Sequence, residues 1–268
     1  MPNSKVVVVT GVSSGIGRAT AIKFAQMGCR VFGTVRNIEK AQSIEGVELI
    51  EMDVRDETAV QNGVQAIIAQ ANRIDVVINS AGVTLLGATE ETSIAEAQSL
   101  FDTNVFGILR VVKAVLPYMR EQGSGRIVNI SSVLGFLPAP YMGLYSASKH
   151  AVEGLSETLD HEVRKFGIRV SLVEPSFTKT NMDINAPQTA STLSAYDKDR
   201  NTVFEAIQAN VHKAPEPDEV TSTIVNLALG TWKMRRTPKG EASLLRKLRR
   251  FMPFGPVDSG LRKTFGLS

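Results

Sequence analysis

The segment from Lys5 to Gln26 restricts the fold more than any other part of this chain. Lys5–Thr10, KVVVVT, is an unbroken β-branched run that suits a strand buried on both faces of a parallel sheet. Gly11–Gly17, GVSSGIG, follows at once, and Arg18–Gln26 has the pattern of a helix. This order predicts a dinucleotide-binding turn, although its spacing, GxxxGxG, differs from the more familiar GxGxxG.

Each glycine of the turn has a physical role in that interpretation. Gly11 permits the tight turn, Gly15 lets the backbone approach a pyrophosphate, and Gly17 allows close contact between helix and strand. The N–H groups and the dipole of the helix N-terminus attract phosphate. We expect the intervening Ser13, Ser14 and Ile16 to contact the same ligand. The alternative is a glycine-rich turn that binds nothing.

Strands and helices alternate along the chain. Further strands are predicted at Cys29–Val35, Val47–Met52, Asp75–Asn79, Gly125–Ser131 and Ile168–Glu174. Helices are predicted at Asp56–Gln70 and Tyr145–Phe166, and two helical stretches lie within Ser93–Met119 around Thr103-Asn104-Val105, the second ending near Pro117. The alternation predicts a single α/β domain over residues 1–268, with an open, doubly wound, mostly parallel sheet covered by helices on both faces. Ligands of such sheets bind beyond the carboxyl ends of the strands, where Gly11–Gly17, Asp53, Asn79–Gly82, Ser132 and Pro175 all fall.

The end of the second strand indicates the type of dinucleotide. NAD-binding folds usually place a carboxylate there for the ribose hydroxyls, but this strand ends in Thr34-Val35-Arg36-Asn37. Arg36 would instead attract a 2′-phosphate, which favours NADP(H) over NAD(H). Otherwise, Arg36 is a solvated loop residue.

Tyr145 and Lys149 are four residues apart, so a helix places both side chains on one face. A nearby ammonium lowers the pKa of a phenol, whose ordinary value is near 10, and makes it a usable general acid or base. Ser132 offers a hydroxyl that could polarise a carbonyl. The alternative is a surface Tyr–Lys pair and an unrelated loop serine.

From about Lys5 to Thr180 the chain resembles the short-chain dehydrogenase/reductases, in particular the steroid- and retinoid-type branch. The resemblance rests on Thr10–Gly17, Asn79-Ser80-Ala81-Gly82, Asn104, Ser132 and Tyr145-Ser-Ala-Ser-Lys149. It implies a Rossmann-like fold and an active tetrad of Asn104, Ser132, Tyr145 and Lys149. It further implies cofactor contacts from Asp53, Val54, Asn79, Ala81, Gly82, Lys149, Pro175, Thr178 and Thr180. Ser176 departs from the glycine that the family usually has after this proline.

The resemblance and the residues agree on one reaction: hydride transfer between NADP(H) and a hydrophobic ketone or secondary alcohol. Ser132 would polarise the carbonyl, Tyr145 would exchange its proton, and Asn104 would anchor a water that connects Lys149 to solvent. A catalytically silent NADP-binding regulator is the rival from another class. A nucleotide-sugar epimerase or dehydratase shares YxxxK but usually needs a longer chain.

The sequence gives a weaker signal for the residues that bind the substrate. Leu134, Phe136, Tyr141 and Met142 lie between Ser132 and Tyr145 and could line an apolar pocket with Met182, or could simply pack the loop. The polar segment 181–213 is either a mobile lid or a helical flap with no catalytic role. Residues 233–268 form a basic extension with ten basic and two acidic residues, a net charge of +8 in a chain of +3.

Within that extension, Glu241–Phe251, EASLLRKLRRF, predicts an amphipathic helix. Its leucines and phenylalanine would pack onto the domain or a neighbouring subunit, with contact to a membrane surface as the less favoured alternative.

We do not expect nucleic-acid binding, because no recognition motif accompanies the local charge. We also expect no metal site: His150, His161 and His212 lack ligand spacing and Cys29 is the one cysteine. The chain start lacks a signal-peptide pattern, which favours a cytoplasmic protein. The resemblance implies a homodimer or homotetramer formed through Ser93–Met119 and Tyr145–Phe166.

Overall fold

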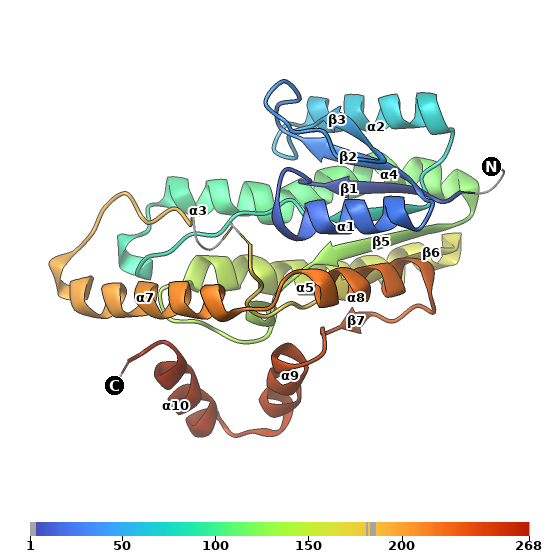
Figure 1. Ribbon diagram of the computed structural model, residues 1–268. Coiled ribbons are helices and arrows are strands. Elements are labelled where there is room, and N and C mark those ends of the chain that lie inside the picture. Colours follow the sequence, from blue (N-terminus) through green and yellow to red (C-terminus); the bar gives the residue numbers. More distant parts are fainter. Residues whose placement is uncertain (1–3, 181, 183–185, 268) are drawn as a thin grey trace.

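The computed structural model describes residues 4–180, 182 and 186–267 of the chain. Its centre is a sheet in the order β3-β2-β1-β4-β5-β6-β7, with every neighbouring pair parallel (Figure 1). The strands are β1 (Val6–Thr10), β2 (Arg30–Val35), β3 (Val47–Glu51), β4 (Val76–Asn79), β5 (Gly125–Ile130), β6 (Ile168–Val173) and β7 (Arg235–Arg236). The predicted doubly wound parallel sheet is confirmed. The sequence did not predict β7, because two residues are too short to show a period.

The strand sequences explain why the sheet is buried on both faces. All five residues of β1 are buried. Val6 and Val8 pack into one hydrophobic layer, whereas Val7 and Val9 pack into the layer on the opposite face. This division follows from the period of two along a strand, and it explains why the run has no polar alternation.

Helices cover both faces of the sheet. The chain contains α1 (Gly15–Gln26), α2 (Glu57–Ala71), α3 (Ile94–Phe101), α4 (Gly107–Gln122), α5 (Gly143–Val163), α7 (Asp197–Lys213), α8 (Asp218–Leu229), α9 (Glu241–Phe251) and α10 (Phe254–Thr264). α1 and α8 pack on one face, and α2, α4 and α5 pack on the other. We expected the helix before β5 to end near Pro117, and this prediction is wrong. Pro117 lies inside α4, where Val115 and Met119 anchor both flanks in the core.

Two segments lie outside this three-layer core. α7 packs through Val203, Phe204 and Ile207 into a third apolar cluster that also contains Met142 and Tyr145. The segment 181–213 therefore includes a packed helix; residues 181 and 183–185 lie outside the described residues, so a lid remains a prediction. α9 and α10 form an angled pair beyond β7 (Figure 1). In the part of the chain that the structure describes, no helix is both long enough and apolar enough to traverse a bilayer.

Candidate active site

The glycine turn is closely packed at the carboxyl end of β1. Gly11 has φ +72°, and a Cβ there would lie 2.8 Å from the Cα of Ala81. A Cβ on Gly17 would lie 2.4 Å from the carbonyl oxygen of Gly11. Ser14 stands at the N-cap of α1, but among the described residues its side chain makes no capping hydrogen bond. The N–H groups of the first turn are therefore left to another acceptor, an arrangement that fits the phosphates of a dinucleotide.

The ends of β1, β4 and β5 are joined by polar side chains. Thr10 Oγ1 accepts hydrogen bonds from the backbone N–H groups of Ser80 and Ala81, each at 3.0 Å. Asn79 Nδ2 donates to Asn129 Oδ1 at 2.8 Å, so the side chain of Asn79 ties β4 to β5. Its Oδ1 atom is buried and has no partner among the described residues. Asn79 does not line the cavity described below, so any support that it gives to a cofactor is indirect.

Asn104 lies in a π-helical turn, Asp102–Phe106, between α3 and α4. Such single turns inside helices are frequent at functional sites. Asn104 Oδ1 accepts from the N–H of Val83 at 2.9 Å, and Nδ2 donates to the carbonyl of Val83 and to Ser148 Oγ. Both amide donors are thus used, and the second lone pair of Oδ1 is what the side chain retains for a water.

Ser132 begins the loop after β5. Its Oγ accepts a hydrogen bond from the N–H of Leu134 at 3.1 Å, and its own donation to the carbonyl of Pro175 is long, at 3.5 Å. The hydroxyl is consequently held in place while its proton is only weakly engaged. This is the geometry that a donor to a substrate carbonyl requires.

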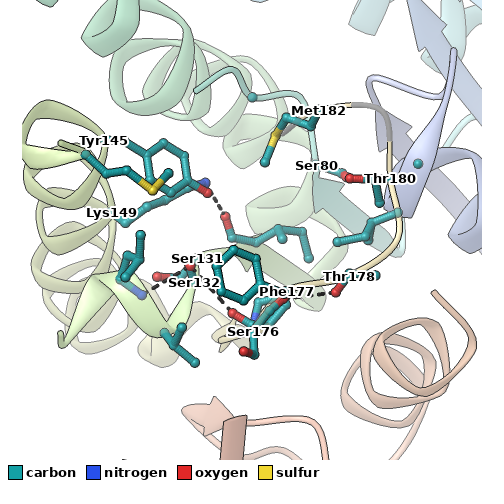
Figure 2. Close-up of a pocket in the computed structure, with 18 of the residues that line it drawn as sticks. Ser80, Ser131, Ser132, Tyr145, Lys149, Ser176, Phe177, Thr178, Thr180 and Met182 are labelled. Carbon is teal, nitrogen blue, oxygen red and sulfur yellow. Dashed lines mark hydrogen bonds between the residues drawn. The ribbon is translucent and has the colours of Figure 1, made fainter. Parts of the chain in front are cut away.

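Tyr145 and Lys149 are both buried and project from α5 into the same space as Ser132 (Figure 2). Lys149 Nζ donates to the carbonyl of Ile130 at 2.9 Å and lies 5.5 Å from the centroid of the Tyr145 ring. The predicted juxtaposition of phenol and ammonium is therefore present. Burial strengthens their electrostatic interaction because less water screens it.

One cavity of about 280 Å³ joins the glycine turn to these side chains. Most of the predicted site residues line it: Gly11, Ser13, Ser14, Gly15, Ile16, Gly17, Ala81, Gly82, Ser132, Leu134, Met142, Tyr145, Lys149, Pro175, Thr178, Thr180 and Met182. Two expected substrate contacts, Phe136 and Tyr141, are not among the lining residues. Tyr141 packs instead against the third apolar cluster.

Three predicted cofactor residues, Arg36, Asp53 and Val54, also lie outside the cavity. Arg36 is exposed directly after β2. Asp53 accepts two hydrogen bonds from Arg55 Nε and one from Nη2, and these hold the pKa of its carboxyl below the ordinary value. The charge of Arg36 lowers this pKa further. Val35 pairs with Glu51 in the sheet, so Arg36 and Asp53 follow neighbouring strand ends. Val54 is buried against the position of Gly107.

The C-terminal helices supply a wall that the sequence did not predict. Glu241 and Leu245 of α9 line the cavity, as do Leu261, Thr264 and Phe265 at the end of α10. We expected the apolar residues of 241–251 to pack onto the domain or a neighbouring subunit. The prediction that they pack onto the domain is wrong for Leu244, Leu248 and Phe251, whose side chains have exposed fractions of 56%, 40% and 79%. The amphipathic pattern of 241–251 signalled the helix, but not which face would meet the pocket.

Polar contacts hold α9 against the sheet. Ser176, which replaces the usual glycine, donates through Oγ to Glu241 Oε2 at 2.7 Å. Arg246 Nη1 lies 3.1 Å from Oε2 of Glu174, whose side chain is 1% exposed. Burial raises the pKa of Glu174, and the neighbouring charge of Glu153 raises it further, while Arg246 opposes both effects. Ser176 thus serves the closure of the pocket in this chain.

The remaining titratable residues form no metal centre within the described ranges, where no group of three or more His, Cys, Asp or Glu side chains could hold an ion.

Comparison with known proteins places the chain. The short chain dehydrogenase family model matches residues 5–191. A 3-ketodihydrosphingosine reductase of Bacteroides thetaiotaomicron is 42% identical over 181 residues, which are 68% of this chain and 66% of the relative. A short-chain dehydrogenase from Streptomyces avermitilis has 34% identity and a TM-score of 0.81, with 98% of this chain and 95% of that one covered. A Burkholderia phymatum short chain dehydrogenase/reductase in complex with NAD has 26% identity and a TM-score of 0.78, with 92% of each chain covered. The chain belongs to the short-chain dehydrogenase family and is an oxidoreductase.

Proposed function

We propose that this protein interconverts a hydrophobic ketone and the corresponding secondary alcohol with NADP(H), and that Tyr145 is its acid and base. One observation carries the proposal: a single cavity runs from the uncapped N-terminus of α1 to Ser132 and the buried Tyr145 and Lys149. A catalytically silent regulator would need the first half of this cavity but not the second.

The residues divide the proton chemistry between them. In reduction, Ser132 donates a hydrogen bond to the substrate carbonyl and stabilises the charge that develops on its oxygen. Tyr145 transfers its phenolic proton to that oxygen, and the ammonium of Lys149 favours the phenolate that remains. Asn104 orients a water near Lys149 through its remaining lone pair, so that the proton can be replaced from solvent. In oxidation the same groups act in the reverse order.

The cofactor end of the cavity supports a nicotinamide dinucleotide, which supplies or accepts the hydride when it is bound. The first turn of α1 would hold the pyrophosphate, and Gly15, with φ +58°, keeps the backbone open there. The preference for NADP(H) is our inference from Arg36, an exposed cation at the end of a strand that has no carboxylate. The Burkholderia relative binds NAD, so family membership alone does not decide between the two cofactors.

The rest of the cavity supports an apolar substrate. Beyond the catalytic groups, the walls are largely aliphatic or aromatic and come from four separate parts of the chain: Leu134, Leu137, Met142, Phe177, Met182, Leu245, Leu261 and Phe265. Burying an apolar ligand surface there is favourable by about 25 cal/mol per Å². The name of the Bacteroides relative also denotes reduction of a ketone. We propose that the present protein likewise acts on a ketone.

The direct test follows oxidation of NADPH or NADH by absorbance in a screen of ketones with long or cyclic apolar groups. Tyr145→Phe should retain cofactor binding and lose turnover by a factor of at least about 10², the low end for a general acid. Tyr118→Phe, on α4 and outside the cavity, is the matched control. Cofactor binding without turnover of any ketone or alcohol would support the regulator instead. Near wild-type turnover by Tyr145→Phe, with chemistry rate-limiting, would exclude Tyr145 as the acid.

A further inference from the structure

The amphipathic helix α9 has two faces with unusual surroundings. Its inner face contains Ala242, which is buried, Leu245, which lines the cavity, and Arg246, which reaches Glu174. Its opposite face, which a surface helix normally makes polar, carries Leu244, Leu248 and Phe251. These residues follow the spacing i, i+4, i+7, so they form one stripe along the helix.

The stripe is strongly exposed. The exposed fractions are 56% for Leu244, 40% for Leu248 and 79% for Phe251. Three large apolar side chains in a row on one helix are not scattered surface residues, because they make one contiguous patch. Figure 1 places α9 and α10 as a pair outside the layers of the domain, so the patch lies on a projecting part of the molecule.

Lys247 flanks the stripe, and Arg249 lies further round the helix, toward its inner face. Lys247 and Arg249 are exposed, and no carboxylate among the described residues forms an ion pair with either. The segment 233–268 has a net charge of +8, whereas the whole chain has +3, so residues 1–232 carry −5. Positive charge is therefore concentrated in the C-terminal segment that contains this stripe, although Arg235 and Arg246 within it are paired with Glu153, Glu157 and Glu174.

We propose that the outer face of α9 docks on the surface of an anionic phospholipid bilayer. The stripe Leu244–Leu248–Phe251 enters the boundary between headgroups and acyl chains. Lys247 beside it contacts the lipid phosphates, and Arg249 adds to the positive charge of the helix. An apolar face beside basic residues is the pattern of a helix that lies in this interface. A stripe of three side chains gives weak and reversible binding, so the cations are needed to hold it.

Charge decides against a second copy of the chain as the occupant. A symmetric contact through α9 would bring the basic side chains of two copies, Lys247 and Arg249 among them, against each other. An anionic surface gains from the same charge. The docking does not depend on the proposed reaction, although Leu245 on the same helix would place the pocket wall directly behind the membrane face.

The test is flotation of the full-length protein with vesicles of phosphatidylcholine alone and with added phosphatidylglycerol. The protein should float with the anionic vesicles, much less with the neutral ones, and less at high salt. The variant L244S/L248S/F251S and the variant K247E/R249E should each lower the partition coefficient by about tenfold or more. The matched controls are Ile94→Ser, an exposed apolar residue of α3, and K23E/K40E, both of which should float like the wild type.

Thermal midpoints close to that of the wild type establish that these variants are folded. Equal flotation of wild type and both α9 variants would overturn the proposal, as would the failure of the wild type to float. If the wild type instead self-associates in sedimentation, and L244S/L248S/F251S abolishes this without affecting flotation, the stripe is a contact between copies and the proposal is wrong. Capture on an immobilised polyglutamate matrix without flotation would point to an acidic protein and would also overturn it.

Discussion

The ion pair between Arg246 and Glu174 gives a prediction that links stability, pH and substrate binding. Removing one partner from a fully buried pair costs about 3–5 kcal/mol, whereas an exposed pair contributes about 0–1 kcal/mol. Here Glu174 is 1% exposed and Arg246 is 40% exposed, so the pair lies between these limits. Thr237 Oγ1 still donates to Glu174 at 2.9 Å after the change. We therefore expect Arg246→Met to lower the free energy of unfolding by about 1–2 kcal/mol.

The loss should depend on pH in a definite direction. Burial, followed by the charge of Glu153, raises the pKa of Glu174 in the folded state. The folded protein thus holds this proton more tightly than the unfolded chain, and the contribution to stability is lost as pH rises through the raised pKa. Arg246 offsets that loss by stabilising the carboxylate. Without Arg246, the protein should lose more stability at mildly alkaline than at mildly acidic pH.

Urea unfolding of the wild type, Arg246→Met and the control Arg249→Met at both pH values measures this effect. Adding Glu174→Gln to Arg246→Met should restore most of the alkaline loss, because position 174 then no longer carries a buried carboxylate that lacks Arg246 as its partner. Since Glu241 and Leu245 of α9 line the cavity, Arg246→Met should also raise the substrate KM several-fold with little change in cofactor affinity. The same loss at both pH values, or no recovery with Glu174→Gln, would refute the ion-pair explanation.

Three further predictions concern the cofactor, the glycine turn and assembly. Arg36→Ala should weaken NADPH binding by roughly tenfold and barely change the affinity for NADH, with Lys40→Ala as a control. Equal losses of affinity for both cofactors in titrations would show that Arg36 does not recognise the 2′-phosphate. Gly17→Ala should destabilise the fold by about 1–3 kcal/mol and abolish cofactor binding, because the new Cβ would lie 2.4 Å from the carbonyl oxygen of Gly11. The control Gly154→Ala on α5, where a Cβ would have no neighbour within 4 Å, should be neutral or stabilising in denaturant titrations. The protein should sediment as a symmetric dimer or tetramer through α4 and α5, and Leu109→Glu, at a residue of α4 that is 39% exposed, should dissociate it; a monomer alone at micromolar concentration would contradict this.

The sequence determined the architecture because its signals are local and repeated. A run such as VVVVT can be satisfied only where both faces of a strand are covered, and its alternate valines indeed enter opposite layers. The carboxyl ends of parallel strands meet at one edge of the sheet, so Gly11–Gly17, Ser132 and Pro175 could be expected together before any coordinates. Helical periodicity likewise placed Tyr145 beside Lys149.

Tertiary structure alone decided where segments with no sequence pattern of their own would pack. The amphipathic pattern of α9 predicted a helix with two distinct faces, but that pattern is the same whichever face turns inward. Its contacts with Ser176 and Glu174 set the rotation, because burying Leu245 over the cavity leaves Leu244 and Leu248 outside. Phe177, Leu261 and Phe265 became pocket walls for the same reason: their partners are far away in the sequence. Local propensity fixes which element forms, but only long-range packing decides what each face of that element contacts.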